Sequence, residues 1–356
     1  MKKNHIIKYI DNNNFIMNTI CKFQDIDIYL LYFFDITTLL LLSSITKDHY
    51  ILISSLQFVR ELHLIKLTNI KHIITVASTC NYISIIKWID ASVNNFKYNT
   101  KAIDSASENG NVIILDWFDK SDYEFKYTIK AIDSASENGH VNILDWFDKS
   151  PYGFKYTINA INMASCRGHI NVLNWFAKSN YEFKYNEHAI NLASNKGHIC
   201  VLDWFDKSDY ELKYNEHAIN WASDNGHICV LDWFDKSNYK FKYTTNAIDL
   251  ASASDKGHIY VLEWFDKSNY EFKYTTYAID YACFEGHTNI LDWFDKSNYE
   301  FKYTSCAIDN AATNGKLNVL QWFKNSKYGL TFTEDTIKKA QKAKQQHIID
   351  WLNNNK

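Results

Sequence analysis

Two hydrophobic patterns follow one another along most of this chain, and residues 128–156 illustrate the first. Ala131, Ile132 and Ala135 share one face of a predicted helix, and the two alanines would let a neighbouring helix approach closely. A second predicted helix, Val141–Lys149, has a wider apolar stripe, which indicates contact with neighbours on both sides. Its expected buried residues are Val141, Ile143, Leu144, Trp146 and Phe147, and its expected exposed residues are Asn142, Asp145 and Asp148.

The second pattern has a period of two residues. In residues 123–127 the aromatic residues Tyr123, Phe125 and Tyr127 alternate with Glu124 and Lys126, which is typical of an extended segment with one buried side. Residues 181–185 and 299–303 repeat the pattern. We expect the aromatic side chains of successive loops to pack on one another, with glutamate and lysine facing water.

Both patterns recur at a fixed interval, which a series of tryptophans marks. The series is Trp88, Trp117, Trp146, Trp175, Trp204, Trp233, Trp264, Trp293, Trp322 and Trp351; eight of the nine intervals are 29 residues, and the step from Trp233 to Trp264 is 31. The units are residues 70–98, 99–127, 128–156, 157–185, 186–214, 215–243, 244–274, 275–303, 304–332 and a truncated 333–356. Such self-similarity predicts an all-α solenoid of about ten helix–turn–helix repeats.

Cap-forming residues and glycines mark the ends of the predicted first helices. Thr128 is a good helix N-cap, and its counterparts are Asn99, Thr157, Asn186, Asn215, Thr244, Thr275, Thr304 and Thr333. One glycine follows each first helix, at Gly110, Gly139, Gly168, Gly197, Gly226, Gly257, Gly286 and Gly315. This placement predicts a left-handed C-terminal cap, and Asn81 fits in the first repeat because asparagine tolerates positive φ.

Residues 131–147, AIDSASENGHVNILDWF, resemble the ankyrin repeat, in which P-L-H-x-A-A-x-x-G-H precedes an apolar helix. The Gly-His pair matches in six repeats, while alanine stands in for the family's proline and aspartate for its histidine. Each repeat is shorter than the usual ankyrin repeat of about 33 residues, so the loops are expected to be shortened. The resemblance covers residues 70–356 and implies a protein-binding module with a concave binding face. The asparagine, isoleucine, lysine and tyrosine bias is also similar to that of ankyrin-repeat proteins of large DNA viruses of amoebae.

Residues 1–69 do not show the repeat, and two interpretations of them stay open. They form a helical cap on the first repeat, or they resemble an F-box: residues 31–35, LYFFD, and 38–43, TLLLLS, match it in order and spacing, although Phe23-Gln24 stands where that family has proline. The F-box resemblance implies a Skp1-type partner and a substrate adaptor of a ubiquitin ligase. The last unit, residues 333–356, is expected to cap the array, because its outer face is rich in lysine and glutamine.

Composition narrows the function classes. The net charge of −3, with acidic and basic residues interleaved, offers no basic patch for nucleic acid. The charge-free run of residues 36–46 is too short to span a membrane, and the N-terminus lacks the apolar core of a signal peptide. The seven cysteines form no CxxC motif, and Cys200 and Cys229, one repeat apart, are too distant for a disulfide. We expect a cytoplasmic protein, in the host cell if the chain is viral, with the nucleus as the open alternative.

No group of residues indicates catalysis, a cofactor or a metal site. The repeated histidines are His140, His169, His198, His227, His258 and His287. Histidines one repeat apart cannot share a metal ion, so we expect them, and likewise His188 and His217, to bond to backbone. The pairs Asp116/Asp119, Asp145/Asp148 and Asp232/Asp235 recur on the polar side of the second helix and are expected to be solvated. The chain contains no GxSxG, HExxH or glycine-rich phosphate loop, and we predict that it is not an enzyme.

The repeats differ at a few positions, and these are the candidate binding residues. One first-helix position reads Ser105, Ser134, Met163, Leu192, Trp221, Leu250, Tyr281 and Asn310, and the two residues before each glycine also vary. In ankyrin proteins the matching positions border the concave face, and aromatic residues and arginine are typical of binding hot spots. We therefore predict that Met163, Arg167, Leu192, Trp221, Tyr281 and Phe284 bind a protein partner. The alternative is drift at surface positions that tolerate substitution.

Overall fold

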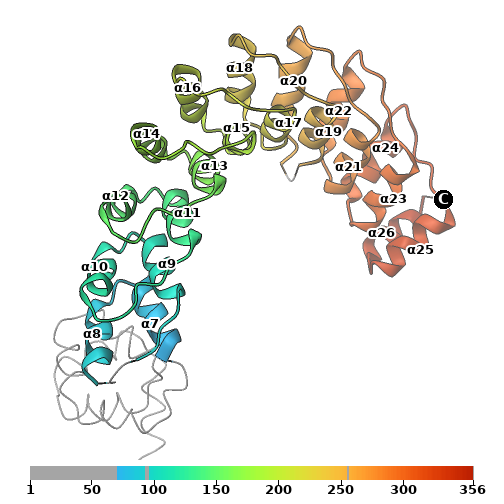
Figure 1. Ribbon diagram of the computed structural model, residues 1–356. Coiled ribbons are helices and arrows are strands. Elements are labelled where there is room, and N and C mark those ends of the chain that lie inside the picture. Colours follow the sequence, from blue (N-terminus) through green and yellow to red (C-terminus); the bar gives the residue numbers. More distant parts are fainter. Residues whose placement is uncertain (1–69, 93–95, 255, 356) are drawn as a thin grey trace, which may run out of the picture. The chain divides into compact units, whose positions relative to one another are not determined.

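The computed structural model describes residues 70–92, 96–254 and 256–355, in which it has 20 helices and no strand (Figure 1). The first helices of the repeats are α7 (Ile70–Thr79), α9 (Lys101–Glu108), α11 (Ile129–Glu137), α13 (Ile158–Cys166), α15 (His188–Asn195), α17 (His217–Asp224), α19 (Asn246–Ala253), α21 (Tyr277–Glu285), α23 (Ser305–Thr313) and α25 (Glu334–Lys342). The second helices are α8 (Ile83–Ser92), α10 (Val112–Lys120), α12 (Val141–Lys149), α14 (Ile170–Lys178), α16 (Ile199–Lys207), α18 (Ile228–Lys236), α20 (Ile259–Lys267), α22 (Thr288–Lys296), α24 (Leu317–Asn325) and α26 (Gln346–Asn353). The predicted all-α repeat architecture is confirmed for these residues.

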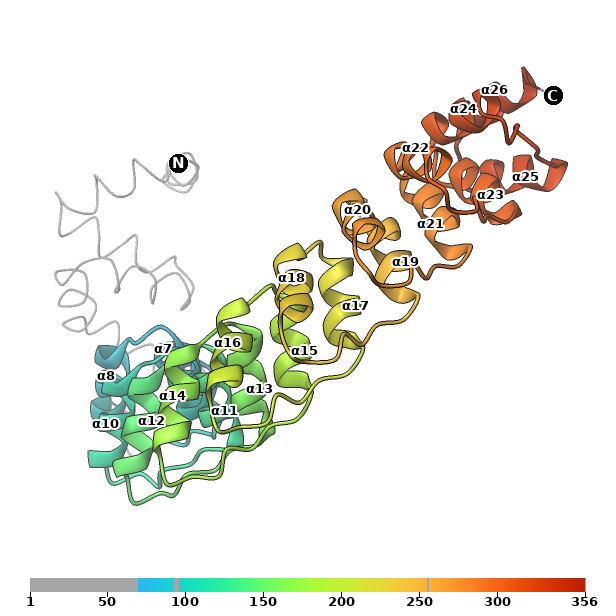
Figure 2. The ribbon, with the colours of Figure 1, turned by 90° about the horizontal axis from the view of Figure 1, so that it is seen from above.

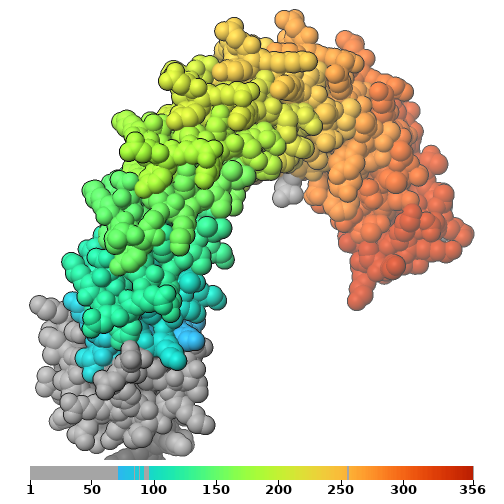
Figure 3. Space-filling model, in the orientation of Figure 1, coloured from blue at the N-terminus to red at the C-terminus, as the bar shows by residue number. Residues whose placement is uncertain are grey.

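The chain divides into two units, residues 1–132 with 145–154 and residues 133–144 with 155–356. In the described part of the first unit, α9 packs on α7 and on α10. In the second unit each first helix from α13 to α25 packs on the next one, and each second helix packs on the first helix of its own repeat. Figures 1 and 2 show these two rows of helices in the second unit; in Figure 1 the first helices α15, α17 and α19 lie on the inner side of a bend and the second helices α16, α18 and α20 on its outer side, and Figure 3 shows the same bend as a surface. Each repeat is thus stabilised by its immediate neighbours.

Small and branched residues fill the interior of each repeat. In α13 and α14 the side chains of Ala160, Ile161, Ala164 and Leu173 are completely buried, and Phe176 is 1% exposed. The corresponding residues are buried in the other repeats of the second unit, so the predicted apolar faces are confirmed. Alanine at two positions of the first helix leaves room for the next first helix to pack closely.

The periodic tryptophans differ from the prediction. Trp146 was expected to be buried, together with Val141, but both side chains are half-buried. The indole N–H of Trp146 donates to Asp116 Oδ1 of the preceding repeat at 2.7 Å, and its ring stacks on Phe125 with centroids 5.2 Å apart. An indole N–H needs a polar partner, and here the partner lies at the surface, so the edge of the ring stays there. The fully shielded aromatic residue of the helix is Phe147.

The turn glycine is required for two reasons. All eight predicted turn glycines have positive φ, as does Asn81 at 60°, which confirms the left-handed cap. In addition, a Cβ atom on Gly197 would lie 2.8 Å from Nδ1 of His227 in the next repeat. Asn81 escapes this overlap because Asn111 stands where six of the other repeats have histidine, and the Asn111 side chain donates to the carbonyls of the preceding first helix.

In the seven first helices from α9 to α21, a buried or half-buried polar residue bonds to the N-cap residue of the next repeat. Asp133 accepts from the backbone N–H of Thr157 at 2.9 Å and from its hydroxyl at 2.6 Å, and the same hydroxyl oxygen caps the helix by accepting the N–H of Asn159. Asn162 instead donates to Oδ1 of Asn186 at 2.7 Å. The pairing recurs as Asp104 with Thr128, Asn191 with Asn215, Asn220 with Thr244, Asp249 with Thr275 and Asp280 with Thr304. The predicted N-caps are confirmed, since each accepts a backbone N–H of its own helix, and the seven from Thr128 to Thr304 also bond to the preceding repeat.

The loops between repeats form no strand among the described residues, and their aromatic rings pack on rings of the next repeat, as predicted. The hydroxyl of Tyr185 donates to the carbonyl of Glu211 in the next loop at 2.6 Å. The loop glutamate Glu182 faces water, as predicted. The loop lysine was also expected to face water, but Lys184 is half-buried and its ammonium lies 4.6 Å from the centroid of the Tyr156 ring. This cation–π contact, repeated in the following loops, joins one loop to the next.

The predicted N-terminal cap or F-box-like segment, residues 1–69, lies outside the described residues. The last repeat has positive φ at Lys344, where the other repeats have glycine or Asn81.

Candidate partner-binding surface

A row of apolar side chains runs across the first helices of the second unit. We define the helix-1 strip as Met163, Leu192, Trp221, Leu250 and Tyr281, which occupy the same position in α13, α15, α17, α19 and α21. The first four side chains are half-buried, and Tyr281 is 36% exposed. Because each first helix packs on the next, these side chains form one continuous row.

Aromatic rings one helical turn apart stack on two members of the helix-1 strip. In α17 the His217 ring lies 4.6 Å from the Trp221 ring, at an interplanar angle of 14°. In α21 the Tyr277 and Tyr281 rings are 4.0 Å apart, and Phe284 stacks on Tyr281 at 5.4 Å. Burial, with a hydrogen bond to the Tyr281 hydroxyl, raises the pKa of Tyr277 to about 12. These stacks hold the rings in fixed orientations along one side of the helices.

A shallow hollow adjoins one end of the helix-1 strip. It has a volume of about 610 Å³ and is lined by Glu137, Asn138, Met163, Cys166, Arg167, His169, Lys196 and His198. The exposed guanidinium of Arg167 reaches back one repeat and donates from Nη2 to Glu137 Oε1 at 2.7 Å.

The structure therefore brings all six predicted binding residues onto two features, the helix-1 strip and the hollow. Met163, Leu192, Trp221 and Tyr281 belong to the helix-1 strip, with Phe284 stacked on Tyr281. Arg167, the sixth, lies beside Met163 in the hollow. Sequence reasoning did not select Lys196, His217 or Tyr277; the spacing of four residues between each of the last two and a strip residue was the signal for them.

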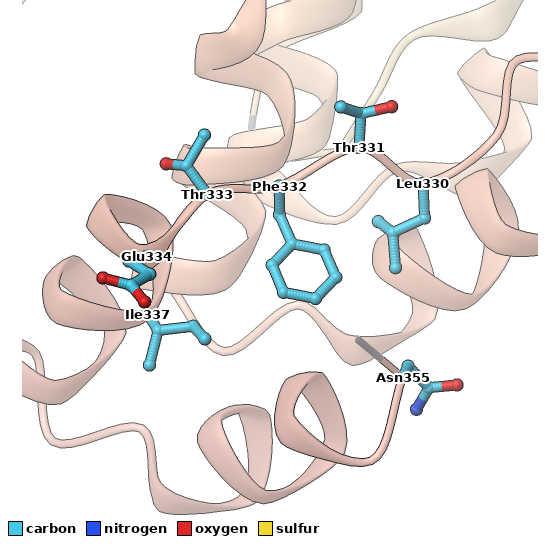
Figure 4. A pocket seen from close by; sticks show the side chains of 7 residues that line it. All are labelled: Leu330, Thr331, Phe332, Thr333, Glu334, Ile337 and Asn355. Atoms are coloured by element: carbon cyan, nitrogen blue, oxygen red, sulfur yellow. The ribbon is translucent and has the colours of Figure 1, made fainter.

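A second hollow, of about 430 Å³, lies at the last repeat. Figure 4 shows Leu330 and Phe332 of the last loop lining it, with Ile337 of α25 and Asn355 nearby. Leu330 and Phe332 take the places of Phe301 and Tyr303, which stack on the rings of the following repeat. This hollow is thus part of the open end of the array.

The repeated histidines bond to backbone, as expected, but to that of the preceding repeat. Nε2 of His287 lies 2.7 Å from the carbonyl oxygen of Ser254. Burial lowers the pKa of His169, His198, His227 and His258. Of the two first-helix histidines, His217 stacks on Trp221, as described above. No group of three or more histidine, cysteine, aspartate or glutamate side chains is placed to hold a metal ion among the described residues.

The paired aspartates lie at the surface, as expected, with Asp119, Asp145, Asp148 and Asp235 exposed and Asp116 and Asp232 half-buried, but some of them also bond to the next repeat. Asp116 accepts the indole N–H of Trp146, and Asp119 accepts the hydroxyl of Tyr152 at 2.9 Å. Asp232 likewise accepts from Trp264 at 2.7 Å. These three carboxylates therefore each join their repeat to an aromatic residue of the next one.

Across the described residues, no helix is both long and apolar enough to cross a membrane. Comparison with protein-family models and with curated protein sequences found no match.

Proposed function

We propose that this chain is a protein-binding module, without catalytic activity of its own, that holds a partner polypeptide on the first-helix side of its repeats. The observation that supports the proposal is the helix-1 strip. Ser134 and Asn310 occupy the same position in the flanking repeats, so packing does not require an apolar side chain there. In five consecutive repeats the side chain at this position is apolar and in contact with water. Such side chains lower solubility without strengthening the core, unless a partner covers them.

The composition of the surface supports a protein as the ligand. Tryptophan, tyrosine and arginine are the residues most enriched in binding hot spots, and Trp221, Tyr281 and Arg167 lie on or beside the strip. The resemblance to ankyrin repeats points the same way, since that family binds proteins on its concave face.

Affinity capture with the full chain tests this proposal. The wild-type protein, the double variant Trp221→Ala/Tyr281→Ala and the control Tyr260→Ala are immobilised, and captured proteins are identified by mass spectrometry. Tyr260 is a suitable control because it is 70% exposed and belongs to the second helix α20. We expect the double variant to lose about 2 kcal/mol or more of binding free energy with little change in melting temperature, and Tyr260→Ala to bind normally. A partner that binds all three proteins equally would refute the proposal.

A further inference from the structure

The residues that follow the helix-1 strip differ in charge from repeat to repeat. Four residues after Met163 and Leu192 stand two cations, Arg167 and Lys196. Four residues after Trp221 and Tyr281 stand Asn225 and Glu285. Positive charge is therefore concentrated beside the first two members of the strip, in the hollow described above.

The groups that line this hollow make it a suitable site for an anion. The carboxylate of Glu137 forms an ion pair with Arg167, whereas Lys196 is exposed and forms no ion pair with any described residue. His169 and His198 are directly followed by the first turns of α14 and α16, each 9 residues long, whose backbone N–H groups add partial positive charge. The net formal charge of the lining side chains is +1, from Arg167 and Lys196 against Glu137, with both histidines neutral.

The corresponding hollow three repeats further on lacks this excess of positive charge. It has a volume of about 330 Å³ and is lined by Asp224, Asn225, Ser254, Lys256 and His258. One carboxylate there faces one ammonium, so the formal charges cancel. The positive hollow is thus a local feature of residues 137–198 and not a property of every repeat.

Spacing indicates the conformation of the ligand. Packed helices lie roughly 8–10 Å apart, so successive members of the helix-1 strip are separated by about that distance. A chain in the extended polyproline II conformation advances about 3.1 Å per residue with three residues per turn, so one turn covers about one repeat. A segment in this conformation along the strip would place every third side chain over the same position of the next first helix.

From these observations we infer that the strip and the hollow together bind an extended segment of the partner protein in which an acidic side chain is followed by apolar side chains at three-residue intervals. The acidic group, a carboxylate or a phosphate ester, enters the hollow against Arg167 and Lys196, and the apolar side chains cover Leu192, Trp221 and Leu250. Met163 lines the hollow and also begins the strip, so the two features are continuous. This inference rests on the proposed protein-binding function.

Fluorescence anisotropy with synthetic peptides and the full chain tests the inference. One set of peptides has glutamate, phosphoserine or lysine at the first position, followed by leucine at every third position. A second set has the same composition with leucine at every second or every fourth position. We expect the acidic peptides with three-residue spacing to bind the wild-type protein, and Lys196→Glu to weaken that binding at least about tenfold while favouring the lysine peptide. Lys178→Glu, the same charge change at an exposed position ending α14, should have no effect.

The glutamate and phosphoserine peptides distinguish the two sources of the acidic group, and tighter binding of either supports the inference. Equal binding of all spacings, no effect of Lys196→Glu or no binding of any peptide would overturn it. The captured partner separates this inference from the proposed function. Suppose that a partner is lost by Trp221→Ala/Tyr281→Ala but is bound normally by Lys196→Glu. This result would support the proposed protein-binding function and refute the anion-binding role of the hollow.

Discussion

Single residues in this protein are constrained by the neighbouring repeat as much as by their own backbone. Gly197 needs its left-handed conformation, yet the imidazole of His227 also occupies the space that any side chain at position 197 would need. The two positions without glycine agree with this reasoning: Asn81 faces Asn111 instead of a histidine, and Lys344 belongs to the last repeat. Glycine and histidine are therefore coupled across five repeat boundaries, from Gly139 and His169 to Gly257 and His287.

This coupling can be measured with a double-mutant cycle. Gly197→Asn should cost about 2 kcal/mol in unfolding free energy, from backbone strain and overlap with His227. The double variant Gly197→Asn/His227→Asn should be more stable than the sum of the single effects by about 1 kcal/mol, because it recreates the pair Asn81 and Asn111. Gly329→Asn is the control for strain alone, since Gly329 has a φ of +69° and open space around it. Additive single effects in urea denaturation would show that the overlap does not matter.

The same histidines make stability depend on pH. Burial lowers the folded-state pKa of His169, His198, His227 and His258 below the unfolded value, so the unfolded chain binds more protons as the pH falls. Their contribution is fully present above about pH 6.5 and is lost at lower pH. We expect the melting temperature to fall between about pH 7.5 and 5. The quadruple variant with asparagine at these positions should lose most of this dependence, and an unchanged slope would assign it to other groups.

At the scale of the helix, the sequence could predict most of the architecture because its signals are local. Apolar spacing, cap residues and turn glycines each act within a few residues, and the described helices follow them. Contacts between repeats were harder to predict. These contacts join residues 24 to 33 positions apart: Asp116 with the half-buried Trp146, Asp119 with Tyr152, and Asp133 with Thr157. Only the stacking of one repeat on the next brings such residues together.

The pairing of first-helix polar residues with N-caps gives a prediction at this scale. A threonine hydroxyl can donate to a carboxylate while accepting an N–H, whereas Oδ1 of the N-cap Asn186 accepts both bonds. Thr157→Asn should therefore place an acceptor against the half-buried Asp133 carboxylate and cost about 1–2 kcal/mol. Adding Asp133→Asn should recover most of that loss, because it recreates the pair Asn162 and Asn186. Chemical denaturation of both variants checks this, and a double variant less stable than Thr157→Asn would contradict it.

At the scale of the whole molecule, stability should be close to a sum of repeats and of the boundaries between them. The candidate binding surface was only partly predictable for a related reason. Variation among repeats identified Trp221, Tyr281 and Arg167, but the distribution of charge around Lys196 required the hollow to be seen in three dimensions. A surface built from one residue per repeat has no continuous sequence motif.

Deleting whole repeats tests this description. Removing residues 186–214 should place Asn162 against Asn215 at the new repeat boundary. These two asparagines form a matched hydrogen-bonding pair, so the shortened protein should fold and remain helical. Removing residues 157–185 instead joins Asp133 to Asn186, an unmatched pair, and should be less stable than the first deletion by about 1–2 kcal/mol. Adding Asp133→Asn to the second deletion should remove this difference in stability. Removing residues 186–199, about half a repeat, should instead break the register and cause aggregation. Circular dichroism, size exclusion and urea denaturation give these comparisons. If the half-repeat deletion behaves like the whole-repeat deletions, each repeat cannot be the unit of folding that the boundary contacts require.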